Sequence, residues 1–354
     1  MIRTSSNRIT DSVVFLSLVR YRVIVILVAT LVLSASFVPG FFEGRTLSLG
    51  VDRVATMGLL AIGLTVVLIA GQLDLSGGAI LALSGIAAIG LQPALGQIPA
   101  ALVGIAVAMA AGAINGVLVV VLKINSLVAT LATMVFFRAV CHLITDSRPV
   151  SGTDPFFGIP LTQPVAGTVS VRVLLFLALI LLLHFWLTRS VGGRNLFAVG
   201  SNAASATASG VRSNAYLFGA FVFSGTMAGV AGVTFSIASN TGSPVFGDTI
   251  VLTAIAAVVI GGTRLEGGVG SALGTLGGLL TLAALTTAME YQSVPAYVQD
   301  IVTGCILLLL ILLDRFTFAK QGVDLSLSAL ARRLRRRGPG AQKDTTQEIE
   351  RTIA

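Results

Sequence analysis

Residues 53–92 read RVATMGLLAIGLTVVLIAGQLDLSGGAILALSGIAAIGLQ, two apolar runs separated by a short polar, glycine-rich break. A helix needs about 20 apolar residues to cross the hydrocarbon layer of a bilayer. The runs at 53–71 and 77–92 are close to that length, and each is continuous rather than alternating. We therefore predict two membrane-spanning helices joined by the polar break.

The composition of the whole chain agrees with these two runs. Of its 354 residues, 55% are apolar and 11% are charged, and the mean hydropathy is +0.95. Soluble domains carry about 25% charged residues, disordered chains have low hydrophobicity, and outer-membrane barrels alternate apolar and polar residues. An ordinary soluble enzyme, a disordered chain and a barrel are therefore excluded. The predicted fold class is all-α, a polytopic bundle of membrane helices.

Ten segments qualify as membrane spans. They are 21–42, 53–71, 77–92, 98–122, 126–145, 172–188, 215–239, 247–262, 267–289 and 295–314. The eighth has a short apolar run, so we expect it to be tilted or re-entrant. The first has an alternative interpretation as a cleaved signal peptide, because arginines precede its apolar core and small residues follow it. The apolar character continues through Phe42, which favours an uncleaved helix.

The distribution of positive charge predicts the orientation. With the N-terminus in the cytoplasm, 18 of the 23 Lys and Arg residues lie in cytoplasmic segments, as the positive-inside rule expects. Ten spans then place both termini in the cytoplasm. We expect a cytoplasmic segment at 1–20, a transmembrane domain at 21–316 and a basic, disordered tail at 317–354. The excess of Lys and Arg in the cytoplasmic segments accounts for the net charge of +8. The charge therefore does not indicate a nucleic-acid partner, and we expect none.

The polar break at 71–78 contains Asp74. A carboxylate at the centre of a membrane helix costs about 2.5–3.5 kcal/mol, whereas a glycine-rich backbone can turn and present polar groups to a cavity. The alternative is that Asp74, with Ser76, caps the following helix. The sequence leaves both interpretations open.

The longest predicted cytoplasmic loop, 188–214, contains three arginines and no acidic residue. Asn202 is suited to cap a short helix over 203–209, which Gly210 would end. A basic surface that carries a short helix suits docking to another protein. The alternative is an ordinary positively charged loop.

Reactive side chains are sparse in the predicted spans. Arg138 and His142 lie four residues apart, on one face of the fifth span. The sequence has no catalytic triad, no acid pair, no metal-ligand spacing and no Gly-Lys-Ser/Thr phosphate loop. We therefore expect no catalytic residue, no metal and no bound cofactor in this chain. We interpret Cys141 and Cys305 as small packing residues.

Several motifs occur in a fixed order along residues 50–315. They are Gly71-Gln-Leu-Asp-Leu-Ser-Gly-Gly78, Gly112-Ala-Ile-Asn-Gly116, Leu127-Val-Ala-Thr-Leu-Ala-Thr-Met134, Ser147-Arg-Pro149, Gly193-Arg-Asn-Leu-Phe-Ala-Val-Gly-Ser-Asn-Ala-Ala204, Ser209-Gly-Val211, Val259-Ile-Gly-Gly-Thr263 and Gly267-Gly-Val-Gly-Ser271. In this order and spacing the sequence resembles the permease subunits of bacterial ABC importers of the ribose/xylose/arabinose class.

The resemblance implies a multi-pass protein of the bacterial inner membrane that pairs with a second permease copy, identical or related. It implies a cytoplasmic ATPase partner, which holds ATP and Mg²⁺, and a periplasmic sugar-binding protein. It also implies that loop 188–214 couples the permease to the ATPase. The residues that carry this coupling role are Arg194, Gly200, Asn202, Ala203, Ala204, Ser209 and Gly210.

A path for a neutral sugar needs hydrogen-bonding groups and little charge. The residues we predict along it are Asp74, Asn115, Asn125, Thr130, Arg138 and Asn240. The alternative is that each satisfies polar groups inside the bundle. Two rival functions are a related permease for branched-chain amino acids or nucleosides, and a secondary transporter driven by an ion gradient. The resemblance implies a monosaccharide substrate, a pentose or a similar sugar or polyol, and the sequence does not indicate which one.

Overall fold

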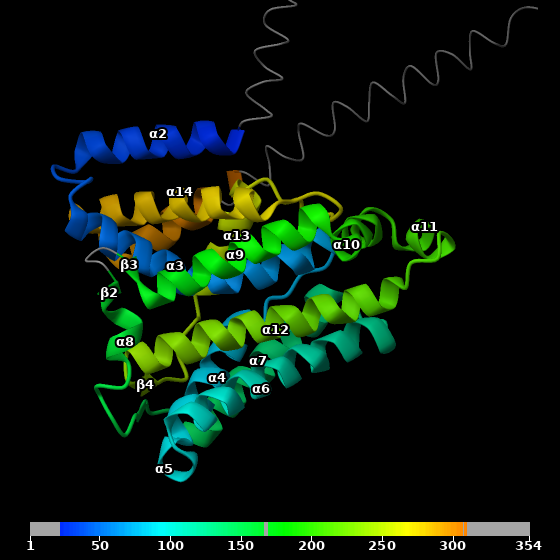
Figure 1. Ribbon diagram of the computed structural model, residues 1–354, viewed down its shortest axis with the longest axis horizontal. Helices are drawn as coiled ribbons and strands as arrows, with labels where there is room; N and C mark the ends of the chain where they lie inside the picture. Colours follow the sequence, from blue (N-terminus) through cyan, green and yellow to red (C-terminus); the bar gives the residue numbers. More distant parts are fainter. Residues whose placement is uncertain (1–21, 166–168, 307, 310–354) are drawn as a thin grey trace, which may run out of the picture. The chain divides into compact units, whose positions relative to one another are not determined.

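The computed structural model describes residues 22–165, 169–306 and 308–309 (Figure 1). The chain divides into two compact units, Met1–Gly304 and Cys305–Ala354, and the features described below belong to the first. The predicted segment at 1–20, the predicted tail at 317–354 and the last residues of the tenth predicted span lie outside the described residues.

Helices account for nearly all of the described elements. In chain order the elements are α2 (Arg22–Phe37), α3 (Gly44–Ile69), α4 (Gly77–Gly90), α5 (Gln92–Leu95), α6 (Gln97–Gly116), the π-helical turn η1 (Val117–Val121), α7 (Ser126–Thr145), β1 (Val150–Ser151), α8 (Ile159–Thr162), β2 (Pro164–Val165), β3 (Val169–Ser170), α9 (Val171–Arg189), α10 (Val191–Ser201), α11 (Ala203–Ala208), α12 (Ser213–Ala238), β4 (Thr241–Gly242), α13 (Ile250–Ile260) and α14 (Ala272–Tyr291). Residues 296–306 are also helical.

Each of the ten predicted spans overlaps a described helix, and the fifth, at 126–145, coincides with α7. Six of the described helices are long and apolar enough to cross a membrane. The protein is therefore a polytopic helical membrane protein. The count of ten spans and the orientation of the termini stay predictions.

The eighth predicted span, 247–262, is shorter in the structure than expected. Its helix, α13, has 11 residues and is about 16 Å long at 1.5 Å per residue, against a hydrocarbon layer of about 30 Å. Residues 243–249, which precede α13, are irregular. Gly247 has a φ of +82° and packs against the backbone of Gly78 at the start of α4. Irregular backbone inside a membrane is tolerated where protein surrounds it or a cavity adjoins it.

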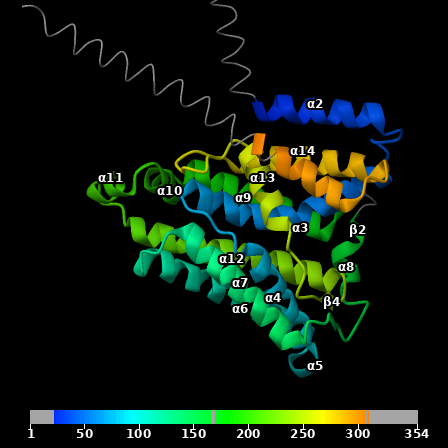
Figure 2. The ribbon, with the colours of Figure 1, turned by 180° about the vertical axis from the view of Figure 1, so that it is seen from behind.

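Helix α12 packs against α3, α4 and α6, and from behind α6 and α7 lie beside α4 (Figure 2). The contact between α6 and α12 is made by glycines. A Cβ at Gly112 would lie 2.5 Å from the carbonyl oxygen of Phe221, and one at Gly225 would lie 2.6 Å from that of Ala108. These Gly-x-x-x-Gly residues thus bring two backbones together, as small residues do in membrane bundles.

Three loops that are far apart in the sequence meet at one end of the bundle. The amide of Gly268 donates a hydrogen bond to the carbonyl oxygen of Ile69 (2.9 Å). A Cβ at Gly200 would lie 1.8 Å from the same oxygen, and one at Gly267 would lie 2.5 Å from the Cα of Gly71. We call this contact of Gly71, Gly200, Gly267 and Gly268 the glycine junction. It places the polar break, loop 188–214 and loop 261–271 on one side, as the predicted topology requires.

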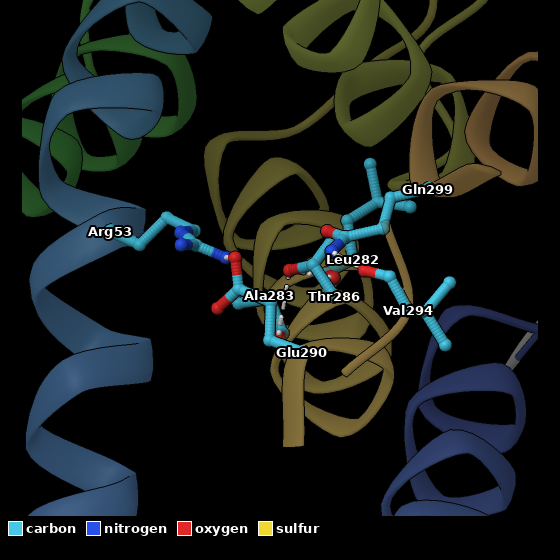
Figure 3. Close-up of polar contacts among 7 residues, drawn as sticks. All are labelled: Arg53, Leu282, Ala283, Thr286, Glu290, Val294 and Gln299. Carbon is cyan, nitrogen blue, oxygen red and sulfur yellow. Dashed lines mark hydrogen bonds and ion pairs between the residues drawn. The ribbon is translucent and has the colours of Figure 1, made fainter. Parts of the chain in front are cut away.

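The opposite end is held by polar contacts. Arg53 of α3 forms an ion pair with Glu290 of α14 (2.6 Å), and Figure 3 shows the two side chains pointing toward each other. Strand β1 pairs with β4, so that Val150 lies opposite Gly242. The segments that we predict to be external therefore also share one end.

Candidate functional site

The carboxyl group of Asp74 lies inside the bundle, and the residue is 1% exposed. One of its oxygens accepts hydrogen bonds from the amide (3.0 Å) and the hydroxyl (2.6 Å) of Ser76. The other accepts from the hydroxyl of Ser224 in α12 (2.8 Å). A buried carboxyl group is stabilised only when such donors surround it. The polar break is thus tied both to the start of α4 and to α12.

Asn115 and Thr133 extend this network. The amide of Asn115 in α6 donates to the hydroxyl of Ser76 (2.7 Å), and its oxygen accepts from the hydroxyl of Thr133 in α7 (2.7 Å). All of these residues are buried. We call Asp74, Ser76, Asn115, Thr133 and Ser224 the polar network. It joins the polar break to three helices through side chains alone.

Thr130 holds the backbone of the same break. Its hydroxyl accepts a hydrogen bond from the amide of Leu75 (3.2 Å) and donates to the carbonyl of Ser126 (2.7 Å). The hydroxyl of Ser126 in turn accepts from the amide of Leu73 (3.2 Å). Asp74, Asn115 and Thr130, three of the predicted path residues, therefore converge in one place. Their contacts are internal, and direct contact with a substrate stays a prediction.

Arg138 reaches from α7 to the irregular segment before α13. Its guanidinium donates to the carbonyls of Pro244 and Phe246, the latter at 2.8 Å, and forms an ion pair with Asp248 (2.7 Å). The side chain of Arg138 is 18% exposed and that of Asp248 is 57% exposed. One arginine thus positions the peptide groups that lead into α13.

Beside these contacts of Arg138 lies a cavity of about 630 Å³, between the polar break, α4, α7 and α13. Arg138, His142 and Asp248 line it together with apolar residues, and His142 is within 3.1 Å of the hydroxyl of Ser147. The predicted common face of Arg138 and His142 is confirmed. A mostly apolar cavity with a few polar groups can hold a small polar solute.

Asp248 was missed by the sequence analysis. It is the only acidic residue between Asp154 and Glu266, and it lies inside a predicted span. An ionisable residue within a membrane segment is a candidate functional residue by default, so its isolation was an available signal. The residues around Asp248 give no indication of its ion pair with Arg138, which lies 110 positions earlier in the chain.

Asn125 and Asn240 lie apart from these groups. Asn125 is exposed and caps α7, where its side chain accepts from the amide of Leu127 (3.0 Å). Asn240 lies at the opposite end of the bundle, and its carbonyl accepts from the amide of Gly152 (3.0 Å). The structure therefore does not gather all six predicted path residues into one site.

The loop at 188–214 contains a helix that the sequence analysis did not predict, α10, which fills its first half. Asn202 caps α11, its side chain accepting from the amide of Ser205 (2.9 Å), and Gly210 follows with a φ of +86°. The predicted short helix is confirmed, although it ends at Ala208. In Figure 1, α10 and α11 lie beyond the ends of α9 and α12.

We call α10 and α11, with the turn at Gly210, the elbow. Most of its surface is exposed. Arg194, Asn202, Ala203, Ala204, Ser209 and Gly210 are exposed, whereas Gly200 is fixed in the glycine junction. The elbow therefore presents small exposed side chains at its tip and is anchored to α3 at its base. A partner that pushed on the tip would act on the junction.

Comparisons with known proteins place the chain in a family. Residues 47–311 match a family model described as a branched-chain amino acid transport system/permease component. The chain is 34% identical over 289 residues to the ribose import permease protein RbsC of Bacillus subtilis, which covers 78% of this chain and 87% of the relative. No solved structure matches it.

Two further relatives agree. An inner membrane ABC transporter permease protein of Escherichia coli, YjfF, is 34% identical and covers 78% of this chain and 86% of the relative. The autoinducer 2 import system permease protein LsrC of an Enterobacter species is 33% identical, with coverages of 78% and 80%. The chain therefore belongs to the family of inner-membrane ABC transporter permeases that includes the ribose import permeases.

Proposed function

We propose that the chain is one of two permease subunits of an ABC importer that carries a monosaccharide into a bacterial cell. A periplasmic binding protein delivers the sugar, and a separate cytoplasmic ATPase drives transport. The chain crosses the membrane ten times with both termini in the cytoplasm, and it binds neither ATP nor a metal. The names of its relatives, which include ribose and autoinducer 2 import permeases, support a polyhydroxylated substrate.

One observation carries this proposal, the exposed elbow of α10 and α11 anchored in the glycine junction. An exposed pair of short helices within a basic loop, at one end of a membrane bundle, suits docking to a protein on that side. Because Gly200 contacts both the end of α3 and loop 261–271, movement of the elbow is transmitted directly to the spans. Such a lever couples a motor to a path that alternates between two states.

The cavity beside Arg138 is the place where we propose that the sugar passes. The hydroxyl groups of a sugar need donors and acceptors, and Arg138, His142 and Asp248 supply both. The surrounding apolar lining suits the C–H faces of a sugar ring. Arg138 belongs to the predicted path residues, and we add His142 and Asp248 to them.

The test is uptake of a labelled sugar into proteoliposomes that contain the chain, its ATPase and its binding protein. We expect Ala204→Glu, which places a charge at the exposed tip of the elbow, to lower uptake at least tenfold and to leave basal ATP hydrolysis by the ATPase unchanged. Ala204→Ser, which changes the same exposed position without adding a charge, is the control and retains uptake.

Two outcomes would overturn the proposal. Uptake by the chain alone under a proton or sodium gradient would identify a secondary transporter. Uptake of branched-chain amino acids, to which the description of the family model refers, with no uptake of sugars, would identify a different substrate class in the same family.

A further inference from the structure

A second cavity, of about 470 Å³, lies between α3, α9, α10 and α12. Its walls are apolar, with Ile62 and Val66 from α3, Trp186 from α9, and Phe223 and Met227 from α12 among them. Tyr216, which carries a hydroxyl group, is also among the lining residues. Water is disfavoured in an apolar cavity because it finds too few hydrogen-bond partners. The chemistry of this space therefore suits a hydrocarbon chain.

Another cavity, of about 610 Å³, adjoins this one, and both are lined by Ala215 and Tyr216. The other residues of the second cavity belong to α10 and to the loop before α12, and they include Asn195, Gly210 and Arg212. In the described part of the chain, neither cavity is lined by an acidic side chain. An apolar cavity and a polar cavity that has an arginine in its lining thus share the wall formed by Ala215 and Tyr216.

Tyr216 is placed to donate a hydrogen bond into the polar cavity. The amide of Asn195 donates to its hydroxyl oxygen (2.8 Å). Because that oxygen already accepts, the hydroxyl proton is available for a second partner. Arg212, the phenolic proton and the positive charge of loop 188–214 together favour an anionic group. Basic pockets between membrane helices bind lipid headgroups by this chemistry.

We propose that the two adjoining cavities form a binding site for one anionic phospholipid. An acyl chain occupies the apolar cavity between α9 and α12. The phosphate lies in the polar cavity, where Arg212 and the hydroxyl of Tyr216 bind it. The site depends on the membrane location of the chain and does not rest on the proposed transport function.

The experiment uses Trp186, which is the only tryptophan of the chain and lines the apolar cavity. The purified full chain is placed in phosphatidylcholine nanodiscs that contain a low, fixed fraction of a lipid with brominated acyl chains. Bromine quenches tryptophan fluorescence at short range. We expect brominated phosphatidylglycerol to bind with about fivefold preference over brominated phosphatidylcholine, the ratio for one arginine near a charged headgroup.

Two variants separate this site from the surrounding lipid. Gly219→Leu fills the cavity, because no atom lies within 4 Å of a Cβ built at Gly219, and we expect it to remove the preference. Its control, Gly90→Leu, also enters open space but lies in α4, and it retains the preference. Arg212→Gln removes the preference and Arg148→Gln, an exposed arginine after α7, retains it.

Equal quenching by the two brominated lipids in the unmodified protein would overturn the proposal. A preference that survives in both Gly219→Leu and Arg212→Gln would also overturn it, since the anionic lipid would then bind elsewhere. Elution of each variant as a single species in size-exclusion chromatography shows that the fold is intact, so a lost preference then reports the site.

Discussion

At the scale of single residues, the polar network is the feature on which the position of the polar break depends. Asp74 is surrounded by donors from its own segment and from α12, and none of these groups reaches water. Removal of a buried acceptor leaves its donors unpaired, which costs about 1–3 kcal/mol per group. The loss of one member of the network therefore leaves its buried partners without a hydrogen bond.

We expect Asp74→Ala to lower the free energy of unfolding by about 3 kcal/mol, because it leaves the hydroxyls of Ser76 and Ser224 without an acceptor. The measurement is the thermal unfolding of the purified protein in detergent. Asp300→Ala removes an exposed acid and should change stability by less than about 0.5 kcal/mol. Equal stability of the two variants would show that the network does not stabilise the fold.

Arg138 supports a second prediction at this scale. If the proposed path holds water, the ion pair of Arg138 with the half-exposed Asp248 is screened and should be worth less than about 1 kcal/mol. The bonds of Arg138 to two backbone carbonyls hold the segment before α13. We therefore expect Asp248→Asn to be nearly neutral and Arg138→Gln to cost about 2–4 kcal/mol.

The double variant tests this division by thermal unfolding. If the carbonyl contacts dominate, Arg138→Gln with Asp248→Asn is about as unstable as Arg138→Gln alone. A large loss in Asp248→Asn by itself would mean that the ion pair, rather than the carbonyl contacts, holds the segment.

At the scale of elements, the glycine junction and the elbow have different physical requirements. A Cβ at Gly200 would overlap the carbonyl oxygen of Ile69, whereas a Cβ at Gly210 meets no atom within 4 Å. The backbone at Gly210 has a positive φ, which costs other residues about 1–2 kcal/mol. The first glycine permits packing and the second permits a turn.

We accordingly expect Gly200→Ala to destabilise the protein by more than 2 kcal/mol, or to abolish its insertion, because two backbones must separate. Gly210→Ala should cost about 1 kcal/mol and leave the protein inserted. Membrane-fraction yield and thermal unfolding distinguish them. If Gly200→Ala were the milder change, the elbow would not be anchored to α3 as described.

At the scale of the whole molecule, the contacts at the two ends of the bundle agree with the predicted alternation of the chain across the membrane. The glycine junction gathers three predicted cytoplasmic loops, and the pairing of β1 with β4 joins two predicted external ones. These contacts show which loops lie at the same end of the bundle. The excess of positive charge predicts which end faces the cytoplasm.

Single-cysteine labelling measures this orientation. After Cys141 and Cys305 are replaced by alanine, we expect a cysteine at Ser205 in α11 to react with an impermeant maleimide only when the membrane is permeabilised. A cysteine at Thr153 in the loop before α8 should react in intact cells. Labelling of position 205 from outside would reverse the topology and remove the basis for an ATPase partner at the elbow.

Local features of the chain were predictable from its amino-acid order. Helices were located well, as at 126–145, because a bilayer selects long apolar segments and length is a local property. The cap at Asn202 and the turn at Gly210 were also found, since both depend on neighbouring residues. Less could be predicted where helices are interrupted. Helix α13 has only 11 residues, and the segment before it packs against the start of α4, a contact that hydropathy does not reveal.

Long-range contacts account for what the amino-acid order did not reveal. Asp74 meets Ser224, Arg138 meets Asp248, and Gly200 meets Ile69 only after the spans have packed. Composition and periodicity therefore establish that the chain is a membrane bundle with a basic loop on one side. Which polar residues are satisfied internally and which line a cavity follows from packing, because burial and hydrogen-bond partners are properties of the assembled helices.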